Sequence, residues 1–273
     1  TDIVSCRDLD TLGAGVQIKK RTGAKLVYDF HDPYSLMVQD DVPKRLLPLI
    51  DQEERKLLPY VDLVLASDNG RAEWIHNQGV MDGIQVPFRV KVIYNFRDAV
   101  IPYRPMSHTR SLSYTGTLHP SRFIREMVAA VLELDDVTLD IVGPRTPGSL
   151  YDWLAKLGLN EKVRFAGSVT PQVALKVMQR ADVSVQMADP TKEINRLGPY
   201  NRAFDAMAVG RPVIATTGTK NADIIVGLGI GMAADYNIDS FKSIVRTLLG
   251  QSRDVLAQMS MAAYSACLSR FNW

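Results

Sequence analysis

The sequence predicts an α/β protein of two domains, each containing a parallel sheet. Short apolar runs alternate with helical segments along most of the chain, which is the pattern of doubly wound sheets with right-handed crossovers. The chain of 273 residues is long enough for two domains rather than one. Residues 96–110 contain two prolines and scattered charges without hydrophobic periodicity, as a linker does.

The first alternating region precedes this linker. Gly23 ends its first helix, because glycine readily adopts the left-handed conformation of a helix stop. Pro48 is expected to kink an amphipathic helix, and residues 67–69 supply the polar cap of another. We expect strands at 1–5, 25–30, 63–66 and 90–93, and helices from a polar turn at 7–10 to about Arg21, at 42–58 and at 71–78.

The second alternating region begins at residue 111. Its clearest part is a helix at 201–209 that ends at Gly210, since Pro212 cannot continue it. Residues 213–215 then form the apolar run typical of a strand buried on both faces. We expect strands at 111–114, 138–142, 163–165, 183–186 and 213–216, a glycine-containing loop at 116–120, and helices at 122–133, 151–157, 171–180, 201–209 and from about Ser240.

The helix at 201–209 is also the first functional candidate. Its N-terminus presents free N–H groups and the positive end of a helix dipole, which suit an anion such as a diphosphate. Asp205, one turn further on, suits the hydroxyl groups of a ribose. The alternative is an ordinary packing helix with a solvated Asp205.

Composition excludes several classes of function. The formal net charge is only +2 and both signs are mixed throughout, so we expect no nucleic-acid partner. Cys6 and Cys267 are too few and too far apart in sequence for a disulfide framework or a metal site, which suits a reducing cytosol. No apolar run approaches the roughly 18 residues of a membrane span and no signal-peptide pattern opens the chain, so a cytoplasmic protein is expected.

One amphipathic segment leaves peripheral membrane contact open as an alternative. Four cations flank its apolar stripe, a pattern that suits an anionic membrane surface. Three carboxylates dilute this charge, which favours a packed helix with solvated ends. The cations are Lys44, Arg45, Arg55 and Lys56, the stripe is Leu46, Leu47, Ile50, Leu57 and Leu58, and the carboxylates are Asp51, Glu53 and Glu54.

Several motifs in order resemble a known enzyme family. The segments at 114–118, 139–143, 163–167, 181–185 and 204–214 resemble the donor-binding domain of the retaining, family 4 type glycosyltransferases, the glycosyl transferases group 1. The segments at 26–32, 61–67 and 92–95 resemble the later part of the acceptor domain of the same proteins. These enzymes have the GT-B fold, in which two Rossmann-like domains face each other across a cleft.

The resemblance implies a domain plan for this chain. Residues 1–100 are expected to form a partial acceptor-side Rossmann-like domain, and residues 101–110 a linker. Residues 111–255 are expected to form the nucleotide-sugar-binding domain, followed by a C-terminal helix at 256–273 that returns toward the first domain. Compared with the family, we expect the chain to lack the start of the N-terminal domain and the last C-terminal helix.

The resemblance also assigns residues to the diphosphate of a donor. Gly116 in the loop after the first strand, and Arg122 six positions later, are expected to hold it. A cation there neutralises charge on the leaving nucleoside diphosphate. Thr117 departs from the family, since many relatives carry Arg at this position, and Arg202 is expected to compensate. The alternative for Arg122 is a solvated helix residue.

A paired acidic motif of the family is only half present. Asp205 matches its second acidic residue, which binds the ribose hydroxyls, but Leu197 stands at the first acidic position. The role of the missing carboxylate is expected to pass to a neighbour such as Glu193, to pass to backbone amides around Gly198, or to be absent. The remaining donor-binding candidates that the resemblance implies are Gly143, Gly198 and Pro199.

On the acceptor side, the resemblance implies a role for His31. It matches a histidine that points into the cleft near the donor sugar, and it is expected to orient a sugar hydroxyl rather than to act as a strong base. Asp8 and Asp32 are weaker acceptor-side candidates. The alternative for His31 is an ordinary surface-loop histidine beside a strand.

The resulting functional hypothesis is a retaining hexosyltransferase. It moves a sugar from a nucleoside diphosphate sugar to a saccharide or lipid-linked saccharide acceptor, with no metal and no cofactor expected. One alternative is a GT-B nucleotide-sugar epimerase that uses cleft carboxylates for acid–base chemistry. The other is a nucleotide-binding module without turnover, which Leu197 and Thr117 make plausible.

Overall fold

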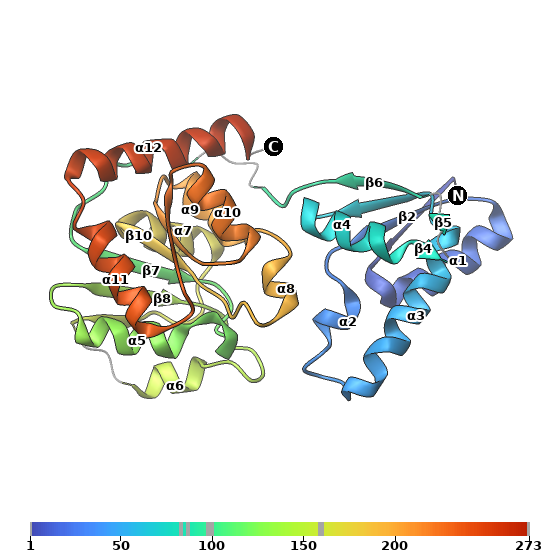
Figure 1. The fold of residues 1–273 in the computed structure, drawn as a ribbon, viewed down its shortest axis with the longest axis horizontal. Coiled ribbons are helices and arrows are strands. Elements are labelled where there is room, and N and C mark those ends of the chain that lie inside the picture. Colours follow the sequence, from blue (N-terminus) through green and yellow to red (C-terminus); the bar gives the residue numbers. More distant parts are fainter. Residues whose placement is uncertain (1, 82–83, 86–87, 97–100, 158–160, 272–273) are drawn as a thin grey trace. The chain divides into compact units, whose positions relative to one another are not determined.

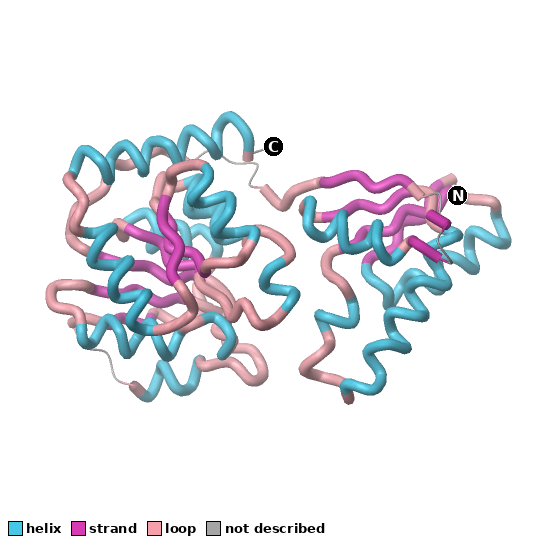
Figure 2. Tube along the Cα trace, in the orientation of Figure 1, coloured by secondary structure: helices cyan, strands magenta, loops and turns pink. Residues whose placement is uncertain are grey.

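The computed structural model describes residues 2–81, 84–85, 88–96, 101–157 and 161–271 (Figure 1). The chain divides into two compact units, unit 1 at Thr1–Asn95 and unit 2 at Phe96–Trp273. In each unit helices surround a parallel sheet, as Figure 2 shows by colour. The chain is therefore an α/β protein with two parallel sheets, as predicted.

Unit 1 contains a sheet in the order β1-β2-β3-β6, with all neighbours parallel. Its core forms where alternate residues of β2 meet the helices, with Leu26, Tyr28 and Phe30 fully buried. The strands are β1 (Ile3–Arg7), β2 (Lys25–Phe30), β3 (Leu63–Ala66) and β6 (Arg89–Val92), and β4 (Val80–Met81) and β5 (Ile84–Gln85) form a separate antiparallel pair. The helices are α1 (Asp8–Thr22), α2 (Tyr34–Met37), α3 (Leu47–Leu57) and α4 (Asn69–Gln78), with 3-10 turns at Lys44–Leu46 and Leu58–Tyr60.

Two local predictions for unit 1 are wrong. Helix α1 starts directly after β1 at Asp8, which takes a left-handed φ of 54°, so no separate turn intervenes. Pro48 does not kink a helix, because α3 begins at Leu47 and Pro48 stands in its first turn. There the missing N–H of proline has no partner to lose. Helix α2 and the β4–β5 pair were not predicted.

Unit 2 contains a sheet in the order β12-β11-β10-β7-β8-β9, with all neighbours parallel. The order reverses between β7 and β10, and ligands of such sheets bind beyond the carboxyl ends of the strands at this reversal. The strands are β7 (Ser111–Thr115), β8 (Thr138–Val142), β9 (Val163–Phe165), β10 (Val183–Gln186), β11 (Val213–Thr216) and β12 (Gly231–Ala234). The helices are α5 (Ile124–Glu133), α6 (Tyr151–Lys156), α7 (Pro171–Arg180), α8 (Glu193–Arg196), α9 (Asn201–Ala208), α10 (Lys220–Gly227), α11 (Ile238–Leu249) and α12 (Arg253–Arg270), with a 3-10 turn at Pro120–Arg122.

The C-terminal part of unit 2 differs from the prediction. Strand β12 and helices α8 and α10 were not predicted, and the single helix expected from Ser240 is the two helices α11 and α12. Strand β12 begins with Gly231 because it approaches β11 closely: a Cβ there would lie 1.9 Å from the Val213 carbonyl oxygen. Small residues permit this close approach. Because they replace bulky apolar residues, the sequence of β12 lacks the apolar run by which a buried strand is recognised.

Residues 101–110, expected to form a linker, pack onto unit 2. The Tyr103 hydroxyl lies 3.0 Å from Ser260 Oγ on α12, and the Tyr264 hydroxyl donates to the Ile101 carbonyl at 2.9 Å. Asp182 binds the other end of this segment, where it accepts from the His108 N–H at 2.8 Å. The described part of the segment is therefore fixed by side chains of the domain that follows it.

Arg211, after α9, holds three parts of unit 2 together. It is 1% exposed, and its guanidinium donates to carbonyl oxygens of α7 and its C-terminal end, of the α9 end, and of the 101–110 segment. Burial lowers the pKa of Arg211, but the partners are backbone carbonyls that point toward the charge. The bonds run to Ala181 at 2.7 Å, Gly210 at 2.9 Å, Arg104 at 3.0 Å, Gln179 at 3.1 Å and Val209 at 3.2 Å.

Replacing Arg211 by Lys should lower the free energy of unfolding by about 3 kcal/mol. One ammonium group cannot reach carbonyls from three segments, and each buried carbonyl left unpaired costs about 1–3 kcal/mol. Urea unfolding followed by circular dichroism measures the change. The control is Arg164→Lys, because Arg164 is 54% exposed and paired with Asp140, so its loss should stay within about 1 kcal/mol. Equal, small losses at both positions would contradict the role of Arg211.

Unit 1 contains a buried pair of titratable groups. Glu54 of α3 is 1% exposed, and its Oε1 accepts a hydrogen bond of 2.5 Å from the hydroxyl of the fully buried Tyr28. Burial raises the pKa of Glu54 to about 7, although the Tyr28 hydrogen bond acts in the opposite direction. The folded state therefore keeps the Glu54 proton to a higher pH than the unfolded state does.

This pair predicts a pH dependence of unit 1 stability. The raised pKa of Glu54 adds to the free energy of unfolding of unit 1. This addition is complete below the ordinary pKa of 4.5 and is lost as the pH rises to about 7. The expected loss is roughly 3 kcal/mol, because one pKa unit corresponds to about 1.4 kcal/mol. The stability difference between wild type and Glu54→Gln, measured by urea unfolding from pH 4 to 8, should follow this curve and level off above it. A difference that is constant over this range would exclude a raised Glu54 pKa.

Candidate functional site

The loop after β7 lies at the reversal of the unit 2 sheet. Gly116 follows β7 with a φ of 142°, a conformation that residues with a side chain rarely adopt. Its N–H donates to the Val142 carbonyl at 3.1 Å, which ties the loop to the end of β8. The next turn is fixed as well, because the Tyr114 hydroxyl donates to the Thr117 carbonyl at 2.5 Å. The backbone of the loop is therefore held in place from two sides.

Gly143, a predicted donor-binding residue, lies under this loop. A Cβ on Gly143 would stand 2.2 Å from the Gly116 carbonyl oxygen and 2.7 Å from Leu118 Cγ. Its own N–H donates to the Gly167 carbonyl at 3.0 Å. The structure thus shows Gly143 as the residue that lets the Gly116 loop approach β8.

Two arginines, Arg122 and Arg202, lie near Tyr114 and the Gly116 loop. A Cβ on Gly116 would lie 3.7 Å from Arg202 Cγ, so Arg202 passes directly over the loop. The Arg122 guanidinium lies 4.8 Å from the centre of the Tyr200 ring. Burial raises the pKa of Tyr114, while the charges of Arg122 and Arg202 act in the opposite direction because both lie near its hydroxyl. Two cations predicted from distant parts of the sequence are therefore brought to one loop.

Asp205 is buried beside Arg202 rather than solvated. Its Oδ2 accepts from Arg202 Nη1 at 2.7 Å, and the residue is 4% exposed. The Arg202 side chain is 37% exposed, so one of its ends remains accessible. Burial raises the pKa of the Cys267 thiol on α12, and the negative charge of Asp205 on α9 raises it further. Asp205 thus orients a cation at the Gly116 loop.

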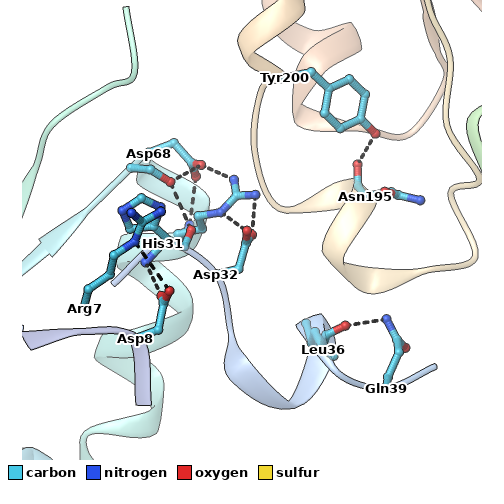
Figure 3. A network of polar contacts seen from close by, with 11 residues as sticks. Arg7, Asp8, His31, Asp32, Leu36, Gln39, Asp68, Asn195 and Tyr200 are labelled. Carbon is cyan, nitrogen blue, oxygen red and sulfur yellow. Dashed lines mark hydrogen bonds and ion pairs between the residues drawn. The ribbon is translucent and has the colours of Figure 1, made fainter. Parts of the chain in front are cut away.

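The segment before α9 carries the other predicted donor residues. Gly198 is buried, and Pro199 and Leu197 are half-buried. Tyr200 follows them, and its N–H donates to Asn221 Oδ1 at 3.4 Å. Its hydroxyl donates to the Asn195 carbonyl at 2.8 Å (Figure 3). Glu193 is exposed.

Three residues of this region were not predicted: Tyr200, Asn221 and Tyr236. Asn221 is 0% exposed, and within the described part of the chain its Nδ2 has no hydrogen-bond partner. Burial raises the pKa of Tyr236 to about 12, while a backbone hydrogen bond from Phe123 acts against this. Phe123 takes a left-handed φ of 59° just before α5. Tyr200 and Tyr236 lie in short loops before helices, and Asn221 lies in the first turn of α10. None of these positions singles the residues out in the sequence.

In unit 1, the residues predicted for the acceptor side lie together at the carboxyl end of β2. The His31 N–H donates to Asp8 Oδ1 at 3.3 Å, and the His31 carbonyl accepts from Ser67 Oγ at 3.3 Å (Figure 3). The ring lies between Arg7, 3.3 Å from Nδ1, and Asp29, 3.3 Å from Nε2. Because arginine only donates and a carboxylate only accepts, these contacts fit the neutral tautomer with the proton on Nε2.

Asp32 belongs to an adjacent ion-pair network. Arg71 Nε and Nη2 both reach Asp32 Oδ1, at 2.8 and 2.6 Å, and Arg71 Nη1 pairs with Asp68. Asp68 also caps α4 by accepting from the Arg71 N–H at 2.9 Å. Burial lowers the pKa of Arg71, but the two carboxylates outweigh this and raise it. Asp32 is thus held in an ion pair with Arg71.

Metal ligands do not gather in the described residues. No group of three or more His, Cys, Asp or Glu side chains there is arranged to hold a metal ion. Within the same residues, no helix has both the length and the hydrophobicity of a membrane-spanning segment. The predicted amphipathic stripe, which spans α3 and the 3-10 turns on either side, is divided: Leu58 is fully buried, whereas Leu46 is 39% exposed. Leu49 of α3, outside the stripe, is 57% exposed.

Residues 109–251, just over half of the chain, match the family model described as Glycosyl transferases group 1. The chain belongs to this family. It is thus a member of a family of sugar transferases, as the motif order predicted. No curated protein matches the sequence.

Several solved structures share the fold over 99–100% of this chain. Sucrose-phosphate synthase from Thermosynechococcus elongatus has a TM-score of 0.78 at 15% identity, over 100% of this chain and 70% of its own. HepE from Anabaena, in complex with UDP and glucose, has a TM-score of 0.75 at 17% identity, over 99% and 74%. TarM from S. aureus has a TM-score of 0.76 at 16% identity, over 99% and 52%. At these identities the matches show the GT-B fold.

The contact under the Gly116 loop can be tested directly. Gly143→Ala should lower the free energy of unfolding by about 1–3 kcal/mol, because the new methyl group overlaps backbone that cannot move aside. Urea unfolding measures this. The control is Gly227→Ala in α10, where a Cβ meets no atom within 4 Å; it should be neutral or slightly stabilising. Equal stability of the two variants would show that the loop yields.

Proposed function

We propose that unit 2 binds the diphosphate of a nucleoside diphosphate sugar, and that the chain transfers the sugar to a hydroxyl acceptor with retention at the anomeric carbon. The observation that carries this is the pair Arg122 and Arg202 at the Gly116 loop, where the sheet order reverses. Two cations at this edge suit a dianionic group. Membership of the glycosyl transferase family supports sugar transfer as the reaction.

The chemical contribution of the two arginines is electrostatic. When the bond between the sugar and the diphosphate breaks, negative charge builds on the leaving phosphate oxygens. Guanidinium groups held at that position stabilise this charge without reorganisation during the reaction. Arg202 supplies the cation that Thr117 does not provide, and we propose that no metal ion is needed.

Asp205 is proposed to act through Arg202. Its Oδ2 already accepts from Arg202 Nη1, so the carboxylate fixes the guanidinium over the loop. The alternative, predicted from the family resemblance, is a direct contact between Asp205 and the ribose hydroxyls. The two roles differ in which part of the nucleotide loses affinity when Asp205 is changed.

His31 is proposed to orient a hydroxyl of the sugar or acceptor. Both of its ring nitrogens are engaged, by Arg7 and Asp29, so the neutral ring has no lone pair free to take a proton. The leaving phosphate oxygen is then the base that accepts the acceptor proton. Asp8 fixes the His31 backbone, whereas Asp32 acts on the Arg71 network.

The donor is proposed to be a UDP-sugar, and the acceptor a saccharide or a lipid-linked saccharide. HepE and TarM, which share the fold, were solved with UDP. The exposed Leu46 and Leu49 leave peripheral membrane contact open for a lipid-linked acceptor. Leu197, in place of the first acidic residue of the family motif, favours one competing proposal, a nucleotide-binding protein without turnover.

Transfer itself is tested by nucleotide release. The protein is incubated with UDP- and GDP-sugars and with candidate saccharide acceptors, and free nucleoside diphosphate is measured. Release that depends on acceptor is expected, and Arg202→Gln should reduce it at least about tenfold, the equivalent of 1.4 kcal/mol in the barrier. Arg246→Gln, an exposed arginine on α11, is the matched control. If the protein binds a nucleotide but releases no nucleoside diphosphate from any of the sugar donors, the result would favour a nucleotide-binding protein without turnover.

The role of Asp205 is tested by comparing UDP with uridine. If Asp205 holds Arg202, Asp205→Asn should weaken UDP by about 1–3 kcal/mol and leave uridine unchanged, because uridine has no phosphate. Calorimetry or a competition assay measures both ligands. Arg202→Gln should give the same pattern, and the double variant little more than either single one. Equal losses for UDP and uridine would instead assign Asp205 to the ribose.

A further inference from the structure

We propose that unit 2 has a second binding site, for a soluble ligand that carries two or more phosphate groups. Two recesses of about 790 and 510 Å³ share Arg104, Gln179 and Arg180, so they form one groove, the α7 groove. It reaches the first residues of β7 and β8, Ser111 and Thr138, whereas the donor loop follows the last residue of β7. The groove and the proposed donor site therefore lie at opposite ends of the strands.

The floor of the groove is a polar face of the sheet. Thr138, Asp140 and Arg164 all line it, and Asp140 is the register partner of Arg164. The alternate residues Leu139 and Ile141 are fully buried in the core on the other face. Because successive strand residues point to opposite faces, the polar side chains at these positions lie on the face that lines the groove.

The groove carries an excess of positive charge. Arg104, Arg164, Lys176 and Arg180 line it, against one carboxylate, Asp140. Asp140 is used by Arg164, which binds it through Nε at 2.6 Å and Nη2 at 2.8 Å. Arg104 and Arg180 are exposed, and neither pairs with a carboxylate among the residues that the structure describes. The groove therefore attracts an anion.

The walls of the groove are already fixed. Gln179 Nε2 donates to the Pro102 carbonyl at 2.9 Å, and Ser107 Oγ to the Arg180 carbonyl at 3.3 Å. The buried Arg211 holds the Arg104 carbonyl at 3.0 Å. A ligand has only the exposed side chains to order, which lowers the entropic cost of binding.

Phosphate is the anion that fits these groups best. Apart from Arg164, which binds Asp140, two of the three cations that line the groove are arginines, whose planar guanidinium binds phosphate with two parallel hydrogen bonds. Hydroxyl groups of Ser107, Thr109 and Thr138 line the same recess. Lys176 and Arg180 stand one helical turn apart, about 6 Å along α7, so the groove presents separate cations to successive anionic groups.

The first experiment locates the ligand on the wild-type protein. Tripolyphosphate is the probe, phenylglyoxal modifies accessible arginines, and peptide mass mapping identifies them. Arg104 and Arg180 should be protected at least about fivefold, while the exposed Arg21 and Arg246 are unaffected. Protection confined to Arg122 and Arg202 would overturn the proposal, because the probe would then occupy only the donor loop.

The second experiment measures affinity by calorimetry. The double variant Arg104→Gln, Arg180→Gln should bind tripolyphosphate at the groove at least about tenfold more weakly, with a shallower salt dependence. Arg21→Gln with Arg246→Gln removes the same charge elsewhere and should change affinity less than twofold. Unchanged affinity in the first variant, or equal losses in both, would overturn the site. Equal affinity for oligoglutamate, or binding to phosphatidylglycerol vesicles without tripolyphosphate binding, would also overturn it, as the site would then be an acidic-peptide or lipid surface.

The outcome is independent of the proposed transfer reaction. Neither experiment uses a sugar donor, and the variants leave the Gly116 loop unchanged. Loss of acceptor-dependent release in Arg202→Gln with normal tripolyphosphate protection at Arg104 supports both proposals separately.

Discussion

The buried guanidinium of Arg211 is the interaction on which unit 2 most depends. Peptide carbonyls at the ends of helices carry partial negative charge, and several of them converge on this one cation. The partners come from α7, from the turn after α9, and from the segment before β7. Helix α9 carries Arg202 and Asp205, and α7 forms one wall of the basic groove. Both proposed sites are therefore held by the same side chain, although it contacts neither ligand.

Much of the fold could be predicted from the sequence because its strands carry clear apolar patterns. Strands β10 and β11 are buried at every position, whereas β8 alternates buried with half-buried residues over most of its length. The strands at 138–142, 163–165, 183–186 and 213–216 have the predicted bounds. Strand β12 could not be recognised in the same way, since Gly231 and alanines replace bulky residues where the backbones approach. Helix α10 did carry a signal, because Thr219 caps it by accepting from the Ala222 N–H at 3.2 Å.

The candidate site was less predictable than the fold, for a geometric reason. The pairing of Arg202 with Asp205 follows from a spacing of three residues on one helix, so the sequence alone contains it. The approach of Arg122 to Tyr200, and of Tyr236 to Phe123, joins residues far apart in the chain. The left-handed backbone of Phe123 has no sequence signature, because a phenylalanine seldom adopts it.

The clamp on Arg202 has a thermodynamic consequence. A free arginine side chain loses up to about 2 kcal/mol of rotamer entropy when a ligand immobilises it. In this protein the ion pair with Asp205 already restricts the Arg202 side chain, so this entropy is lost during folding and not when an anion binds. The carboxylate also cancels part of the attraction that Arg202 offers. The site thus exchanges long-range attraction for a side chain that is already ordered, so binding depends more on how well an anion fits than on how much charge it carries.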